Sequence, residues 1–193
     1  MQKMETLAHF SGEFEDLSST YLSINKGFHA YVSGDYKNAK IHFEKVIACE
    51  SLRDKLCGHE VLRAYIVTLG KIQDSKALIQ AENTVYSLIN NSKIEDVSKG
   101  YLLEGLGRAH ANFNTEESQK FFRLAFKHMD EARKQPDFLT IRYIQLTRSY
   151  LDLYKKSTSD PNKLMSVAIP ALNDAEKYGF VRHKSQILNL INK

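Results

Sequence analysis

The sequence predicts an all-α protein built from stacked helical hairpins, and three observations support that prediction. The 193 residues include only nine glycines and three prolines, which favours long helices over a turn-rich sheet. Apolar residues recur at three- and four-residue spacing through most of the chain. Short polar breaks separate these periodic segments, so consecutive helices should fold back as antiparallel hairpins. We expect a single domain over residues 1–193.

The helix boundaries follow from residues that begin or end helices. Asp35, Thr115 and Asp160 can accept hydrogen bonds from a first helical turn, and Pro161 suits the first position of a helix. Gly179 indicates a helix end. The expected helices span residues 18–33, 35–50, 54–72, 75–90, 95–113, 115–133, 137–156, 161–178 and 181–191, after a short helix or N-terminal extension over residues 1–17.

A three-residue pattern recurs in the second helix of each expected pair. A small residue is followed four positions later by a larger one and three positions after that by an apolar one. The four occurrences are Ala39, Phe43 and Val46; Ala81, Val85 and Leu88; Ser118, Phe122 and Ala125; and Ala168, Leu172 and Ala175. A small residue lets two helices approach closely. Because a closed bundle has no reason to repeat such a pattern, we expect a right-handed superhelical solenoid of about four hairpins over residues 18–178.

The last helix is expected to cap this solenoid. Val181, Ile187, Leu188 and Ile191 share one side of residues 181–191, as in terminal helices that shield the final repeat. Pairing with another copy of the chain is the rival interpretation of this apolar side.

Part of the chain resembles the tetratricopeptide repeat (TPR). Leu103, Leu106, Gly107 and His110 occupy the W-x-x-L-G-x-x-Y positions, with Leu replacing Trp and His replacing Tyr. Residues 33–43 resemble the turn and second helix of the same motif. The small residues of successive units lie 42, 37 and 50 positions apart, whereas the motif repeats about every 34 residues. The helices or connections should therefore be longer than in regular TPR arrays.

The elongated, irregular repeats also resemble the sensor domains of bacterial peptide-pheromone receptors, the group that includes the Rap phosphatases. This resemblance implies a concave groove for a short linear peptide and a response through helix rearrangement or a changed oligomer. In a TPR array the first helix of each pair lines the groove. The candidate peptide-binding residues are then Arg63, Tyr101, Glu104, Arg108, Asn112 and Arg142.

Two of these residues suit recognition of an extended segment. Arg108 and Asn112 are four positions apart and share one helix face. An asparagine both donates to and accepts from a peptide backbone, and an arginine can hold a carboxylate with two hydrogen bonds. The alternative is an ordinary solvated helix face.

An aromatic stripe in the helix expected over residues 18–33 has two interpretations. The motif register directs Tyr21, Ile24, Phe28 and Tyr31 into the groove, whereas a longer connection through Gly34 makes the same side chains core.

The sequence offers no reaction centre. The seven histidines form no pair suited to zinc, and no phosphate-binding loop or nucleophile elbow appears. We therefore expect no catalytic residue, no metal and no cofactor.

Composition limits the location and the partners. No apolar run approaches the roughly 20 residues that span a bilayer, and Cys49 and Cys57 form no CxxC pair and are expected to be packing residues. With no leader sequence evident, a cytoplasmic location and no membrane contact are expected. A net charge of +4 describes a mildly basic surface, well short of the clustered lysine and arginine typical of nucleic-acid-binding proteins, so nucleic acid is disfavoured as a partner.

The leading hypothesis is a non-enzymatic regulator that binds a peptide or protein tail in its concave groove, and a homodimer is compatible with it. The alternative is a structural adaptor or chaperone-like subunit that uses its outer helix faces.

Overall fold

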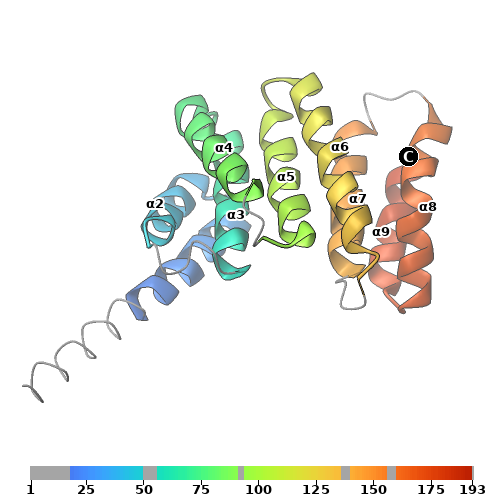
Figure 1. The fold of residues 1–193 in the computed structure, drawn as a ribbon, viewed down its shortest axis with the longest axis horizontal. Helices are drawn as coiled ribbons and strands as arrows, with labels where there is room; N and C mark the ends of the chain where they lie inside the picture. The colour runs from blue at the N-terminus through green and yellow to red at the C-terminus, as the bar shows by residue number, and fades with distance from the viewer. Residues whose placement is uncertain (1–17, 50–55, 91–93, 136–139, 156–159, 193) are drawn as a thin grey trace, which may run out of the picture.

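A computed structural model describes residues 18–49, 56–90, 94–135, 140–155 and 160–192, and all regular structure within these ranges is helical (Figure 1). One helix covers residues 18–32. It is followed by α2 (Tyr36–Ile47), α3 (Leu56–Ile72), α4 (Ser75–Ile89), α5 (Asp96–His110), α6 (Thr115–Ala132), α7 (Thr140–Tyr154), α8 (Pro161–Lys177) and α9 (Val181–Ile191). The all-α prediction is confirmed, and the predicted ends differ from these by at most three residues. The expected element over residues 1–17 lies outside the described ranges.

Side-chain caps explain where several helices begin. Asp35 accepts a hydrogen bond from the backbone three residues later, at 3.3 Å, and Asp160 caps α8 directly before Pro161. For α6 the prediction is off by one position. Asn114, not Thr115, is the cap, and its Oδ1 accepts from two backbone N–H groups at 3.0 and 3.2 Å. Each cap pairs donors that the first helical turn leaves without partners.

Left-handed backbone marks three of the turns. Gly34 and Gly179 have φ of 81° and 72°, a conformation that glycine adopts without steric cost, and Gln73 adopts φ 58°. The α8 helix continues through Pro170 to Lys177.

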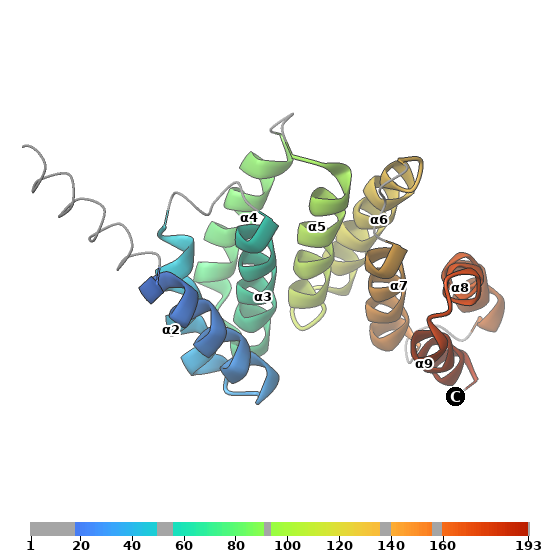
Figure 2. The ribbon, with the colours of Figure 1, turned by 90° about the horizontal axis from the view of Figure 1, so that it is seen from below.

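From α2 to α8 the helices succeed one another broadly in chain order along the long axis of the molecule, and α9 turns back from α8 toward α7 (Figures 1 and 2). Among them, α3, α5, α7 and α9 contact one another in succession. Each of α4, α6 and α8 packs against the two members of that series that flank it in the chain. We call α3, α5, α7 and α9 the inner helices.

The recurring pattern of small and large residues lies in the core. Of its twelve residues, all except the half-buried Leu172 are buried. The four occurrences fall in α2, α4, α6 and α8, the second helix of each expected pair. Within α6 the pattern also carries a hydrogen-bond chain, because the Ser118 hydroxyl donates to Gly107 O of α5 and accepts from Tyr154 OH of α7 at 2.6 Å.

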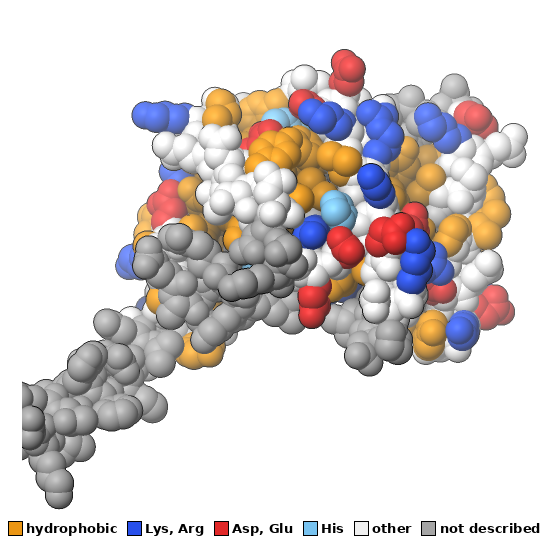
Figure 3. Space-filling model, viewed as in Figure 1, with side chains coloured by type: hydrophobic (Ala, Val, Ile, Leu, Met, Phe, Trp, Pro, Cys, Tyr) orange, Lys and Arg blue, Asp and Glu red, His pale blue; other side chains and the backbone are white. Residues whose placement is uncertain are grey.

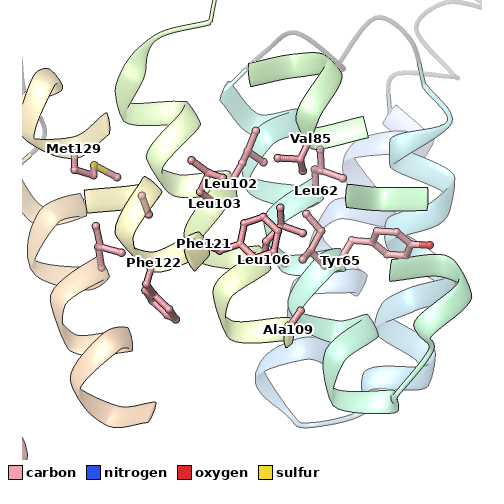
Figure 4. Close-up of a cluster of buried hydrophobic side chains, with 14 of the residues drawn as sticks. Leu62, Tyr65, Val85, Leu102, Leu103, Leu106, Ala109, Phe121, Phe122 and Met129 are labelled. Carbon is pink, nitrogen blue, oxygen red and sulfur yellow. The ribbon is translucent and has the colours of Figure 1, made fainter. Parts of the chain in front are cut away.

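The helix α5 is central and buried on several sides. Leu103 and Leu106, which the motif directs inward, are 2% and 0% exposed. Figure 4 shows them beside Leu62 of α3 and Phe121 of α6. Apolar side chains on most faces are typical of a helix covered by neighbours rather than by water.

Glycines allow two very close helix contacts. A Cβ added to Gly70 of α3 would lie 2.5 Å from Ala109 Cα of α5, and one added to Gly107 would lie 2.6 Å from the Phe122 ring of α6. These contacts exclude any larger side chain at either glycine without movement of the helices.

The aromatic stripe of residues 18–32 is mostly packed. Ile24, Phe28 and Tyr31 are half-buried against the core, and the Phe28 ring meets Phe43 edge-on at 5.3 Å. Tyr21 is 54% exposed. The core interpretation therefore holds for three of the four side chains.

The final helix packs against α7 and α8. Ile187 is fully buried, and Leu188 and Ile191 are half-buried. Val181 is 76% exposed, so it does not belong to the covered side. Its position at the first residue of α9 places it beyond the neighbouring helices.

Two further expectations concern the cysteines and membranes. Cys49 is half-buried and packs against the core, as expected, whereas the side chain of Cys57 is outside the described part. Among the described helices, none has the length and apolar character needed to cross a membrane.

Candidate functional site

The inner helices share one polar pocket of about 560 Å³. We call it the inner pocket. The residues that line it are Arg63, Val67 and Lys71 of α3; Tyr101, Arg108 and Asn112 of α5 and its C-terminal turn; Gln145, Arg148, Ser149, Asp152, Leu153 and Lys155 of α7 and its end; and Gln186, Asn189 and Leu190 of α9. Positions three, four and eight apart on a helix project from one face, which brings these side chains together.

Four of the six predicted site residues line the inner pocket: Arg63, Tyr101, Arg108 and Asn112. The two others, Glu104 and Arg142, lie beside or beneath it and are described next.

Glu104 is a correction to the prediction that it faces the groove. Its side chain is 2% exposed, and the Arg63 guanidinium donates to its carboxylate. Arg108 contacts the other carboxylate oxygen at 3.7 Å. Although burial acts to raise the pKa of Glu104, the charges of Arg63 and Arg108 hold that pKa below its ordinary value. Glu104 therefore stays ionised as the buried counter-ion of two arginines, and it is not among the residues that line the pocket.

Tyr101 joins this ion pair to α7. The guanidinium of Arg63 lies 4.4 Å and that of Arg142 lies 4.3 Å from the centre of the Tyr101 ring. Arg142 also donates to Glu60 of α3. We call Glu60, Arg63, Tyr101, Glu104 and Arg142 the ion network. It connects α3, α5 and α7, so the charges of Arg63 and Arg142 are already compensated within the protein.

Asn112 and Arg108 retain more freedom. The Asn112 side chain is exposed, and its amide donates to Gly70 O at 3.3 Å. The Arg108 side chain is 30% exposed. This i,i+4 pair shares the pocket, as its spacing predicts.

Arg148 is the main pocket residue that the sequence analysis missed. It lies in the middle of α7, and its Nη1 is 3.4 Å from Nδ1 of His183 on α9. An arginine cannot accept a hydrogen bond, so this contact requires a neutral His183 with a bare Nδ1. Burial first, and then the charges of Arg148 and Arg182, lower the pKa of His183, which favours that neutral form. The contact therefore leaves the charge of Arg148 uncompensated.

Basic side chains outnumber acidic ones in the pocket lining. Arg63, Lys71, Arg108, Arg148 and Lys155 face a single carboxylate in that lining, Asp152, which pairs with Lys155 at 3.3 Å. A cavity lined by one sign of charge concentrates ligands of the opposite sign. Lys71 could have been found from the sequence, since it lies two helical turns after Arg63. The contribution of α9 could not, because its rotation against α7 is set by packing.

The opposite surface is chemically mixed. Figure 3 shows basic, acidic and apolar side chains interspersed over the face that is turned to the viewer in Figure 1. A more open groove of about 520 Å³ lies on α6, α7 and α8. The residues lining it, which define the outer groove, are Arg123, Phe126, Lys127, Asp130, Glu131, Tyr143, Ser166, Val167 and Pro170.

Metal ligands do not gather anywhere in the described segments. No group of three or more His, Cys, Asp or Glu side chains there is placed to hold an ion. Comparison with known proteins identifies no relative: no family model matches the chain, and neither the curated proteins nor the solved structures give a significant match.

Proposed function

We propose that the chain is a TPR-like solenoid that binds an extended peptide or protein segment in the inner pocket, without catalysing a reaction. The observation that supports this most directly is the pocket itself, to which four successive inner helices contribute side chains. Its volume of about 560 Å³ is in the range of specific ligand sites. A wall built from several parallel helix faces suits a ligand that runs across them.

The polar side chains of the pocket match the needs of a peptide backbone. An extended segment presents N–H and C=O groups in alternation, and both must be paired when it leaves water. Asn112, Gln145 and Asn189 each offer a donor and an acceptor at the pocket wall. Arg108 adds a cation for a carboxylate of the segment.

The lining gives no reason to propose catalysis. Its one carboxylate, Asp152, is 69% exposed and paired with Lys155. No histidine is among the side chains that line the pocket, so a base oriented beside a nucleophile is not part of the proposal. A regulatory role, as in peptide-pheromone receptors, would require that ligand binding rearrange the helices or change the oligomer.

Selection from a random peptide library, followed by NMR or cross-link mapping on the purified protein, tests this proposal. We expect selected peptides to map to the inner helices and to lose binding to the double variant Arg108→Ala/Asn112→Ala. The matched control is Arg123→Ala/Lys127→Ala in the outer groove, which should bind normally. Peptides that map to the outer groove, or a selection that yields none, would contradict the proposal.

The outer groove supports a second candidate function, a structural adaptor. Phe126, Tyr143 and Pro170 lie among charged side chains in its lining. Met165 and Ile169 on α8 are exposed apolar residues, and exposed apolar side chains that gather on one face often mark protein contacts. In that case Val167→Asp should abolish partner binding, whereas Arg108→Ala/Asn112→Ala should not.

A further inference from the structure

The cations of the inner pocket differ in how well they are neutralised. Arg63 is in direct contact with the buried carboxylate of Glu104, and Lys155 lies 3.3 Å from Asp152. Within the described residues, no carboxylate lies within 4.0 Å of Lys71 or Arg148. Arg108 shares Glu104 with Arg63, at the longer distance of 3.7 Å. We call Lys71, Arg108 and Arg148 the open basic cluster.

Arg148 is the least compensated member of this cluster. Its Nε–H is buried and has no hydrogen-bond partner among the described residues, and its Nη1 meets a neutral histidine nitrogen. A buried donor without a partner is costly, more so when it belongs to a charged group. An anionic ligand at this position would remove that cost.

Helix electrostatics explain only part of the cluster. Lys71 and Arg108 lie in the last turns of α3 and α5, where a cation is stabilised by the helix dipole even without a ligand. Arg148 is in the middle of α7, eight residues after its start, so the dipole does not account for it. Its placement opposite the ends of α3 and α5 brings three cations from three helices to one pocket.

We propose that the open basic cluster selects acidic peptide segments, with Arg148 holding a side-chain carboxylate of Asp or Glu. This inference rests on the proposed function and specifies its ligand class. Arginine and lysine donors form stronger hydrogen bonds to carboxylates than to neutral acceptors, and three converging cations favour a segment with more than one acidic residue.

Nucleic acid fits the same surface less well. Single-stranded nucleic acids bind by stacking bases on aromatic rings that stand beside basic grooves. Tyr101, the one aromatic side chain in the pocket lining, is already covered by the guanidiniums of Arg63 and Arg142.

Fluorescence anisotropy with three labelled peptides of equal length, blocked at both ends, tests the proposal on the full chain. One peptide carries several Glu residues, the second has Gln in their place and the third has Lys. We expect the Glu peptide to bind at least about 10-fold more tightly than the Gln peptide, and its affinity to fall about 10- to 100-fold in Arg148→Ala, the range of one charge-assisted contact.

A second variant guards against a folding defect in Arg148→Ala. Lys71 is exposed, so the Lys71→Glu variant should fold normally. Its affinity for the Glu peptide should fall by a similar factor. The matched control, Arg123→Ala in the outer groove, should bind as the unchanged protein does.

The outcomes separate the two proposals. Equal binding of the Glu and Gln peptides in the inner pocket would overturn the acidic preference and leave peptide binding intact. If the Glu, Gln and library-selected peptides all failed to bind, both the proposed function and the acidic preference would be overturned. Equally tight binding of a short oligonucleotide, lost in Arg148→Ala, would also overturn the inference and assign the cluster to phosphates.

Discussion

The ion network and the open basic cluster lie on the same inner helices and contain similar cations, but those cations differ in their partners. In the ion network, Arg63 and Arg142 each meet a carboxylate supplied by another inner helix, Glu104 of α5 and Glu60 of α3. In the open basic cluster, Lys71 and Arg148 have no such neighbour among the described residues. An arginine on an inner helix is therefore no guide to ligand binding by itself. Whether an arginine is free for a ligand depends on whether another inner helix places a carboxylate against it.

The largest expected effect comes from removing the central carboxylate of the ion network. Glu104→Gln leaves the largely buried Arg63 without its counter-ion, and such losses cost about 3–5 kcal/mol. We expect the free energy of unfolding, measured by urea denaturation, to fall by that amount. Glu60→Gln is the control, since Glu60 is more exposed and surface pairs contribute about 1 kcal/mol or less. Equal effects of the two variants would mean that the network is not organised around Glu104.

A smaller effect is expected where α3 and α5 meet beside the open basic cluster. In Gly70→Ala the new methyl would lie 2.5 Å from Ala109 Cα, so the helices must separate. Overpacking of this kind costs about 1–3 kcal/mol, and the separation should also move Lys71 away from Arg108. Thermal unfolding and binding of the Glu peptide measure the two consequences.

The control for that substitution is Gly179→Ala. No atom lies within 4 Å of the added Cβ there, so only the left-handed backbone is strained, at a cost of about 1 kcal/mol. Normal stability and normal peptide binding in Gly70→Ala would contradict the close contact between α3 and α5.

The fold was largely predictable because its signals are local. Helix periodicity and the caps at Asp35 and Asp160 act within one or two turns, and the recurring small residues such as Ala39 and Ala81 mark buried crossings. The predicted cap of α6, Thr115, is one position from the observed cap, Asn114, because Asn and Thr are both acceptable cap residues. The solenoid arrangement itself stays a prediction, supported by the succession of contacts between the inner helices.

The site was predictable only in part, because pairing between helices is not local. The motif register places Arg108 and Asn112 on one face, and both line the inner pocket. The register could not reveal that Arg63 donates to Glu104, which is 41 residues away in the chain. Nor could it reveal that Arg142 donates to Glu60, which is 82 residues away. Arg148 is not among the predicted site residues, because the sequence of α7 does not show that Arg148 lines the pocket and Arg142 does not. Only the packing of α7 against α9 and α5 separates the two.

The smallest expected effect concerns pH and the contact between α7 and α9. Burial, then the charges of Arg148 and Arg182, lower the pKa of His183 on folding, and a contact with Gln186 opposes them only in part. As the pH falls below about 6.5, the ordinary histidine pKa, the unfolded chain takes up the proton first. The stability contributed by neutral His183 is therefore complete above that pH and is lost as the pH falls through the folded pKa.

The measurement is the free energy of unfolding of the unchanged protein minus that of His183→Gln, between pH 7.5 and 5. We expect this difference to decline as the pH falls, because glutamine keeps an acceptor for Arg148 and does not titrate there. In the Arg148→Gln background the decline should be shallower, since one of the two charges that oppose protonation is gone. If the slope were the same with and without Arg148, the His183 contact would not depend on that arginine. The open basic cluster would then lack the contact from α9 that helps to hold Arg148 at the pocket wall.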